Sequence, residues 1–394
     1  MKTGRRIICL LTAACLATGG AAMAAEEFDV AEISMEQQAI PANDALAFTK
    51  CLKAGWNLGN TFDAVDCDWL SDPMLYESAW CGTLTQPEVF DALAAAGFAS
   101  VRIPVSWHNH VSGEDFIIDA QWLARVQDVV GYALDRGLYV ILNTHHDIGE
   151  AYIYPDREHL ESSAKYLTSI WAQLAEAFAD ADEYMIFEGM NEPRLAGTNL
   201  EWSVNLRDER SKEAVECINA LNQAFVDTVR APGGQNATRY LMVSGYDASL
   251  DGATNETFTL PQDSADNRII ISVHAYTPYA FALQDGGQST FDSNSRKDRS
   301  EIDNLMEKLY RQYIANGIPV VLGEFGARNK DNNLQARADY TAYYVAAAAA
   351  HGIPCFIWDN HAFSGSGELF GLLNRETFTF AYPEIVESMM AYTQ

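Results

Sequence analysis

Short apolar runs alternate with longer amphipathic stretches along most of this chain, and the two patterns predict different elements. A short run rich in valine and isoleucine, bounded by turn residues, is typical of a strand buried on both faces. Eight runs fit this description, at residues 54–58, 100–104, 139–143, 184–188, 240–244, 269–274, 320–324 and 355–358. Helical spacing of apolar residues occurs between them, at residues 86–96, 120–136, 157–179, 211–230, 299–316 and 334–351.

Four of the predicted helices are followed directly by a glycine, where a left-handed C-cap is expected. These glycines are Gly97, Gly137, Gly317 and Gly352. Strands that alternate with helices form a parallel sheet covered by helices. Eight such units predict a closed (β/α)8 barrel, the TIM barrel of the α/β class, in a single domain. An open nucleotide-binding sheet would need a GxGxxG turn after its first strand, and residues 55–60 lack that spacing.

The first 24 residues have the pattern of a secretory signal peptide. Lys2, Arg5 and Arg6 precede an apolar stretch, and Ala22-Met23-Ala24 matches the small-x-small pattern of a cleavage site. We therefore expect a secreted protein, either extracellular or periplasmic. A lipid anchor is the alternative, because the segment ending at Cys15 loosely resembles a lipoprotein box with a spacing one residue too long.

The remaining chain reads as one unit. We expect a flexible lead-in over residues 25–41 and one barrel domain over residues 42–394, because no proline-, glycine- or serine-rich linker divides the latter. No apolar run after the N-terminus is long enough to span a bilayer.

The charge of the chain restricts its partners. The formal net charge is −28, and loss of the three cations in residues 1–24 brings it to −31. Such a surface repels nucleic acid and anionic membranes, so we expect neither as a partner. It suits a neutral substrate and a soluble monomer.

Five cysteines follow the predicted signal peptide, an odd number without a CxxC pair that would indicate zinc. Cys67 and Cys81 flank one acidic, aromatic loop. They form a disulfide after export or remain two separate thiols, and the sequence leaves both alternatives open.

Polar side chains gather where the predicted strands end, which is the edge that carries the active site in a barrel. They are Arg102, His145, His146, Asn191, Glu192, His274, Tyr276, Glu324 and Trp358. Adjacent histidines on an extended strand point to opposite faces, so His145 and His146 predict no metal site, and we expect no cofactor.

Two of these residues, Glu192 and Glu324, are carboxylates on the fourth and seventh strands. Glycoside hydrolysis uses two carboxyl groups that face the scissile bond. At a separation of about 5 Å, one attacks the sugar while the other protonates the leaving oxygen. Arg102 and Tyr276 would keep the attacking carboxylate ionised. Asn191 is placed to bond the sugar 2-hydroxyl, and Trp358 to offer an aromatic face to a sugar ring.

Seven motifs in this order resemble those of glycoside hydrolase family 5, the retaining cellulase-type barrels. They are Gly55-Trp56-Asn57-Leu58-Gly59-Asn60-Thr61, Val101-Arg102-Ile103-Pro104, Asn143-Thr144-His145-His146-Asp147, Met190-Asn191-Glu192-Pro193-Arg194, Val273-His274-Ala275-Tyr276, Gly323-Glu324-Phe325-Gly326 and Phe356-Ile357-Trp358-Asp359-Asn360. The segment 190–247 further resembles subgroup 4, which acts on cellulose, mixed-linkage glucan and xyloglucan.

This resemblance implies Glu192 as general acid/base and Glu324 as nucleophile. It also implies substrate contacts from Asn60, Arg102, His145, His146, Asn191, His274, Tyr276 and Trp358. The expected activity is that of a retaining endo-β-1,4-glucanase acting on β-glucan polysaccharides. Three alternatives stay open: a β-mannanase on the same barrel, a non-catalytic polysaccharide-binding barrel, and a metal-dependent barrel hydrolase.

Overall fold

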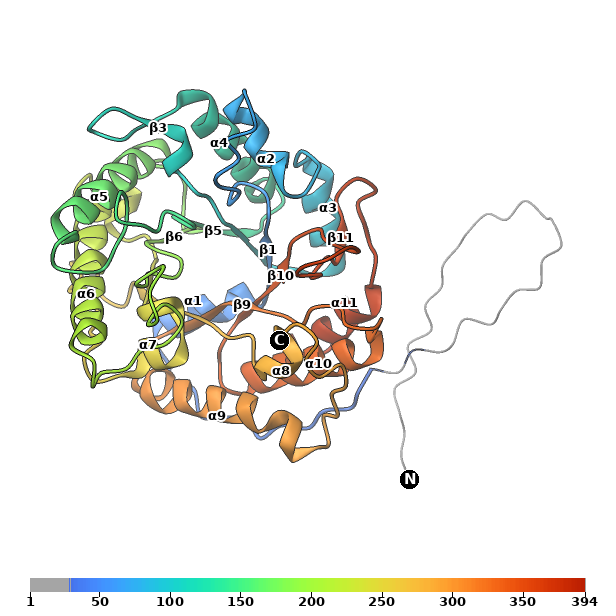
Figure 1. The fold of residues 1–394 in the computed structure, drawn as a ribbon. Helices are drawn as coiled ribbons and strands as arrows, with labels where there is room; N and C mark the ends of the chain where they lie inside the picture. Colours follow the sequence, from blue (N-terminus) through green and yellow to red (C-terminus); the bar gives the residue numbers. More distant parts are fainter. Residues whose placement is uncertain (1–27, 29, 394) are drawn as a thin grey trace.

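Eight parallel strands close into a barrel in the computed structural model, which describes residues 28 and 30–393 (Figure 1). The strands are β1 (Ala54–Leu58), β2 (Ser100–Ile103), β5 (Tyr139–Asn143), β6 (Met185–Glu188), β7 (Leu241–Ser244), β8 (Ile269–His274), β9 (Val320–Phe325) and β10 (Cys355–Asp359). Their order around the barrel is β1-β10-β9-β8-β7-β6-β5-β2, with β1 also paired to β2. The predicted TIM barrel is therefore confirmed.

A ring of helices surrounds this barrel (Figure 1). The helices that connect or follow its strands are α2 (Tyr76–Ala79), α3 (Pro87–Ala96), α4 (Ala120–Leu134), α5 (Leu160–Ala177), α6 (Glu209–Arg230), α7 (Leu250–Thr254), α8 (Tyr279–Ala282), α9 (Arg296–Gln312), α10 (Leu334–Ala350) and α11 (Pro383–Met390). Two short hairpins, β3 (Val111–Ser112) with β4 (Ile117–Ile118) and β11 (Leu373–Asn374) with β12 (Thr379–Phe380), lie outside the barrel. None of the described helices is both long and apolar enough to cross a membrane.

The predicted strands match the observed ones to within one residue at each end, and the six predicted helices to within four. All four glycines expected at helix ends have positive φ, as a left-handed cap requires. The sequence pattern missed the short helices α2, α7 and α8, the terminal helix α11, and α1 (Asp44–Leu52) before the first strand.

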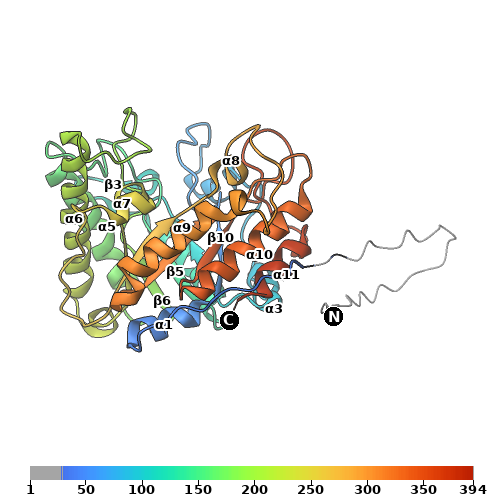
Figure 2. The same cartoon turned by 90° about the horizontal axis from the view of Figure 1, so that it is seen from below.

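The barrel interior is divided into an apolar and a polar layer. Inward side chains at the amino ends of the strands form one apolar cluster, which includes Ile141, Ile186, Met242, Ile270, Val321 and Phe356. Helix α1 covers this end of the barrel: Ala45 and Leu52 join the cluster, and the Phe48 ring stacks on Tyr240 at 3.6 Å between centroids. Figure 2 shows α1 at the lower edge, with α7 and α8 at the opposite end. The carboxyl ends of the strands are left for polar side chains.

Residues 30–41, the N-terminal strap, run across the outside of the barrel below α10 and α11 (Figure 2). The strap is attached by hydrogen bonds from the Gln38 amide to the Ala350 carbonyl and from the Ile33 amide to the Tyr392 hydroxyl. The Tyr310 hydroxyl donates to the Ala39 carbonyl in the same way. We expected a flexible lead-in over residues 25–41; in residues 30–41 of this segment, Ile33 and Met35 pack on the core and the backbone is hydrogen-bonded. Residues 25–27, and the whole predicted signal peptide, lie outside the described residues.

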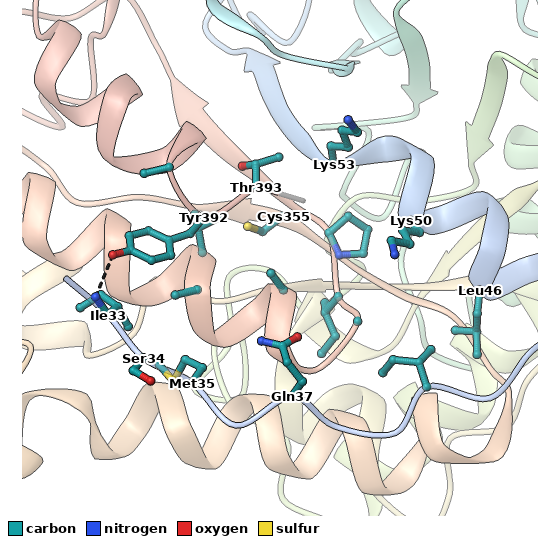
Figure 3. A pocket seen from close by; sticks show the side chains of 18 residues that line it. Ile33, Ser34, Met35, Gln37, Leu46, Lys50, Lys53, Cys355, Tyr392 and Thr393 are labelled. Atoms are coloured by element: carbon teal, nitrogen blue, oxygen red, sulfur yellow. Dashed lines mark hydrogen bonds between the residues drawn. The ribbon is translucent and has the colours of Figure 1, made fainter. Parts of the chain in front are cut away.

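A cavity of about 470 Å³ lies behind the strap (Figure 3). Apolar side chains such as Ile33, Met35 and Ile353 line it together with Lys50 and Lys53. Lys53 precedes β1 and Ile353 precedes β10, so the cavity is at the amino ends of the strands. It is separate from the edge where a barrel carries its active site.

The cysteines of the described chain are all thiols, including Cys67 and Cys81. The Cys67 thiol is buried and donates to the Val65 carbonyl, while the Cys81 thiol contacts the carbonyls of Glu77 and Thr83. Of the two alternatives for this pair, the structure therefore has the one with separate thiols.

Candidate active site

Arg102 occupies the centre of the polar layer and bonds to four side chains. Its Nε donates to Glu188 at 2.7 Å, and its Nη1 donates to Glu324 at 2.7 Å and to Asn57 at 3.0 Å. Its Nη2 donates to the Asn191 side-chain carbonyl oxygen at 2.6 Å, which leaves the Asn191 amide nitrogen free of Arg102. The guanidinium is fully buried. Burial lowers its pKa, but the charges of Glu188 and Glu324 outweigh this and raise the pKa above its usual value.

Glu324 accepts a hydrogen bond on each of its carboxylate oxygens. Arg102 donates to one oxygen, and the Tyr276 hydroxyl donates to the other at 2.8 Å. Burial and the charge of Glu324 raise the pKa of Tyr276 well above its usual range, so this hydroxyl keeps its proton. Donors on both oxygens replace the water that a buried carboxylate loses, and they fix the orientation of its carboxylate plane.

Glu192 has a different set of partners. His274 Nδ1 lies 2.8 Å from one of its oxygens, and Arg194 Nη1 lies 3.7 Å from the other. Burial raises the pKa of Glu192, but the hydrogen bond and charge of His274 outweigh it and lower the pKa. His274 also lies 3.6 Å from Glu324, and oxygens of the two carboxyl groups lie within 4.8 Å of each other. The site therefore pairs two close carboxyl groups in unlike environments.

Of the remaining predicted residues, some lie close to this pair of carboxyl groups and one does not. The ring of His145 lies parallel to Trp358 at 5.9 Å between centroids, and burial lowers the pKa of His145 well below its usual value. His146 faces Trp80 at 6.0 Å and makes no side-chain hydrogen bond within the described chain. Asn60 is outside the hydrogen-bond network of Arg102. It occupies the turn after β1 with a positive φ, and its backbone N–H donates to the Asp63 carboxylate.

Two groups among the described residues bring three possible metal ligands within 4.8 Å of one another. One is Glu192, His274 and Glu324; the other is Asp63, His145 and His146. The adjacent histidines thus point the same way, because they lie beyond the end of β5, where strand alternation no longer applies. In the second group, the Asn143 amide donates to His145 Nδ1 at 3.1 Å, which places the proton on Nε2. Neither nitrogen of His145 then has a free lone pair for a metal.

Comparison with known proteins identifies the family. The family described as cellulase (glycosyl hydrolase family 5) matches residues 64–364. The chain belongs to glycoside hydrolase family 5. Endoglucanase 1 of Ruminococcus albus is 40% identical over 379 residues, covering 94% of this chain and 88% of that protein.

Solved structures of family 5 enzymes have the same barrel. A family 5 lichenase from Caldicellulosiruptor sp. F32, in complex with cellotetraose, has a TM-score of 0.92 and 51% identity, covering 93% of this chain and 100% of that one. A GH5-4 broad specificity endoglucanase from Ruminococcus champanellensis with bound cellotriose has a TM-score of 0.83 and 41% identity, covering 90% and 100%. The chain is a glycoside hydrolase of the endoglucanase type.

Sequence reasoning missed one central residue of this family 5 site. Glu188 is fully buried and accepts hydrogen bonds from Arg102, from Asn143 at 2.9 Å and from Ser272 at 2.6 Å. Its carboxylate fixes the guanidinium that contacts Glu324. A signal was present, because a carboxylate that ends an apolar strand must find a buried cation.

Aromatic side chains are exposed on loops at the same end of the barrel. Trp69, Trp80 and Trp202 have exposed fractions of 71%, 37% and 63%, whereas Trp56 and Trp107 are fully buried. The guanidinium of Arg194 lies 4.0 Å from the Trp202 ring, which connects this ring to the surroundings of Glu192. Exposed rings next to a polar site are surfaces on which sugar rings can stack.

Proposed function

We propose that this enzyme is a secreted, retaining endo-β-1,4-glucanase that cleaves cellulose, mixed-linkage glucan and xyloglucan by double displacement. The observation that carries the mechanism is the short distance between Glu192 and Glu324, whose oxygens lie within 4.8 Å. Retaining glycosidases have carboxyl groups about 5–5.5 Å apart, whereas inverting enzymes leave room for a water between them.

The first step forms a bond between Glu324 and the anomeric carbon. Glu324 attacks as a carboxylate, and Glu192 gives its proton to the glycosidic oxygen as that bond breaks. Arg102 and Tyr276 orient the nucleophile through hydrogen bonds of 2.7 and 2.8 Å. The Asn191 amide, held by Arg102, is directed at the substrate hydroxyl next to the anomeric carbon.

The second step releases the sugar. Glu192, now ionised, takes a proton from a water molecule while the oxygen of that water attacks the anomeric carbon. Glu324 then leaves as a carboxylate. His274 bonds to Glu192 throughout, which stabilises this ionised form. The product keeps the β configuration of the substrate.

The substrate proposal is supported by similar structures described as a lichenase with cellotetraose, a broad specificity endoglucanase with cellotriose and a xyloglucan-specific endo-β-1,4-glucanase with cellotriose. The export proposal rests on the basic, apolar and small-residue pattern of residues 1–24. A β-mannanase remains the second candidate, because the same carboxyl pair serves both reactions.

The mechanism is tested by the stereochemistry of the product and by two variants. Proton NMR during cleavage of barley β-glucan should show the β-anomer first, with the α-anomer appearing only by mutarotation. Glu324→Gly and Glu192→Ala should each lose at least about a thousandfold in kcat on β-glucan. Azide should rescue Glu324→Gly with an α-glycosyl azide, and Glu192→Ala with a β-glycosyl azide on a substrate with a good leaving group.

The same assay ranks the substrates. Activity on β-glucan, carboxymethyl-cellulose and xyloglucan with little on galactomannan supports the glucanase, and the reverse order supports the mannanase. An α-anomer formed first contradicts the retaining mechanism.

A further inference from the structure

The turn after β7 is attached directly to the loop that carries Glu192. This turn is Tyr246–Ala248, and its middle residue, Asp247, has a left-handed backbone with φ 57° and ψ 21°. The Asp247 amide donates to the Pro193 carbonyl at 2.9 Å, one residue after Glu192. The Tyr246 hydroxyl accepts from the Leu195 amide at 3.1 Å. Asp247 is thereby fixed beside the proposed acid/base.

The turn has little freedom to move away. A Cβ on Gly245 would lie 2.5 Å from the Gly252 backbone, and one on Gly252 would lie 1.9 Å from the Tyr246 carbonyl oxygen. Only glycine permits this approach of two backbones. The Tyr246 hydroxyl also donates to the Leu200 carbonyl at 2.7 Å, which fixes the far part of the Glu192 loop as well.

The cationic groups near Asp247 are already paired with other carboxylates. The charged and titratable groups that face it are Glu192, Arg194, Glu201 and His274. His274 is bonded to Glu192, and Arg194 lies between Glu192 and Glu201, at 3.7 and 3.4 Å. Within the described chain the Asp247 carboxyl has neither a hydrogen bond nor an ion pair of its own.

A partly buried carboxyl beside other carboxylates keeps a proton, because the charged form lacks both water and a cation. Burial, followed by the charge of Glu192, raises the pKa of Asp247 to about 8. His274 favours the ionised form of Glu192. As a general acid, however, Glu192 must carry a proton when the glycosidic bond breaks. The two carboxyls titrate as a coupled pair, so the proton that Asp247 favours at neutral pH stays in the pocket next to Glu192.

We propose that Asp247 is a positioning residue that keeps a proton in the acid/base pocket, so that Glu192 can protonate the leaving oxygen at neutral pH. The inference rests on the proposed function, in which Glu192 is the acid/base. The proton leaves on the new sugar hydroxyl in the first step, and the attacking water returns one to the pair in the second. The alkaline limit of the reaction is then set by the pair.

Asp247→Asn tests this assignment, because asparagine accepts a left-handed backbone and removes only the charge. The alkaline limb of kcat/KM on barley β-glucan should move down by one pH unit or more. At the old midpoint the rate should fall at least about fivefold, while the rates of variant and wild type should converge as the pH is lowered. On 2,4-dinitrophenyl β-cellobioside, whose leaving group needs no proton, the variant should match wild type across the pH range.

Two further variants make the result decisive. Asp251→Asn is the matched control, since Asp251 lies on α7 in the same segment and, within the described residues, pairs only with the exposed Lys308. Its pH profile should not change. Asp247→Gly replaces Asp247→Asn if that variant fails to fold, because glycine also fits the backbone. An unmoved alkaline limb, or an equal loss at every pH on both substrates, overturns the proposal. Full activity of Glu192→Gln on β-glucan instead overturns the acid/base assignment itself.

Discussion

Glu188 shows how a residue that never meets substrate can determine the geometry of a site. It and Arg102 are both fully buried, and the guanidinium uses one nitrogen for Glu188 and another for Glu324. A flexible cation that contacted Glu324 alone would sample several orientations. The second carboxylate, with Asn143 and Ser272 as further donors, leaves it one orientation.

Glu188→Ala should therefore destabilise the protein by about 3 kcal/mol or more, because it removes the anionic partner of a buried guanidinium and leaves Arg102 Nε and the Ser272 hydroxyl without their acceptor. Urea unfolding measures this. Asp91→Ala removes a carboxylate from the exposed pair with Arg136 and should change the free energy of unfolding far less, because water screens that pair. Equal losses in the two variants would show that Glu188 contributes no more than a surface charge. The kcat of Glu188→Ala should also fall, since Arg102 loses its alignment with Glu324.

At the scale of elements, the barrel strands were predictable because burial on both faces leaves a continuous apolar run. The elements that the pattern missed depend on the closed barrel. Helix α1 has only nine residues, and it is stabilised by packing against the apolar cluster that the closed barrel forms at the amino ends of its strands. The same holds for the site: Arg102 and Glu324 are strand-end residues that the sequence predicts, whereas Asp247 lies in a turn whose position depends on the neighbouring loop.

Phe48→Ala tests the contribution of α1 to the floor of the barrel. The ring stacks on Tyr240 and meets the edge of Tyr139 at 5.5 Å, so its removal should lower the free energy of unfolding by about 2–4 kcal/mol. The kcat/KM on β-glucan should stay within about twofold, because α1 is at the opposite end from Glu324. Lys50→Ala on the exposed face of the same helix is the control and should change stability by less than about 0.5 kcal/mol. A Phe48→Ala protein as stable as this control would mean that α1 does not support the barrel.

At the scale of the whole molecule, the acidic surface acts on any charged substrate. The sequence has 54 acidic against 26 basic residues, and a charge of this size repels polyanions over a distance that salt shortens. A neutral glucan is not affected by this repulsion.

The kcat/KM on carboxymethyl-cellulose should consequently rise severalfold between about 10 mM and 300 mM sodium chloride, because the Debye length shrinks from about 30 Å to below 10 Å. Barley β-glucan, which is uncharged, should show a change of less than about twofold in the same series. A parallel rise on both polymers would point to an effect of salt on the enzyme itself.

The N-terminal strap brings the two ends of the described chain close together. Tyr392, near the carboxyl end of the chain, bonds through one hydroxyl to Ile33 and Ala31 of the strap. Both ends of the described chain therefore leave the barrel beside each other and away from the edge that carries Glu192 and Glu324. A support attached at either end of the described chain would hold the enzyme with the edge that carries Glu192 and Glu324 facing outward, so immobilised enzyme should keep its access to long polymers.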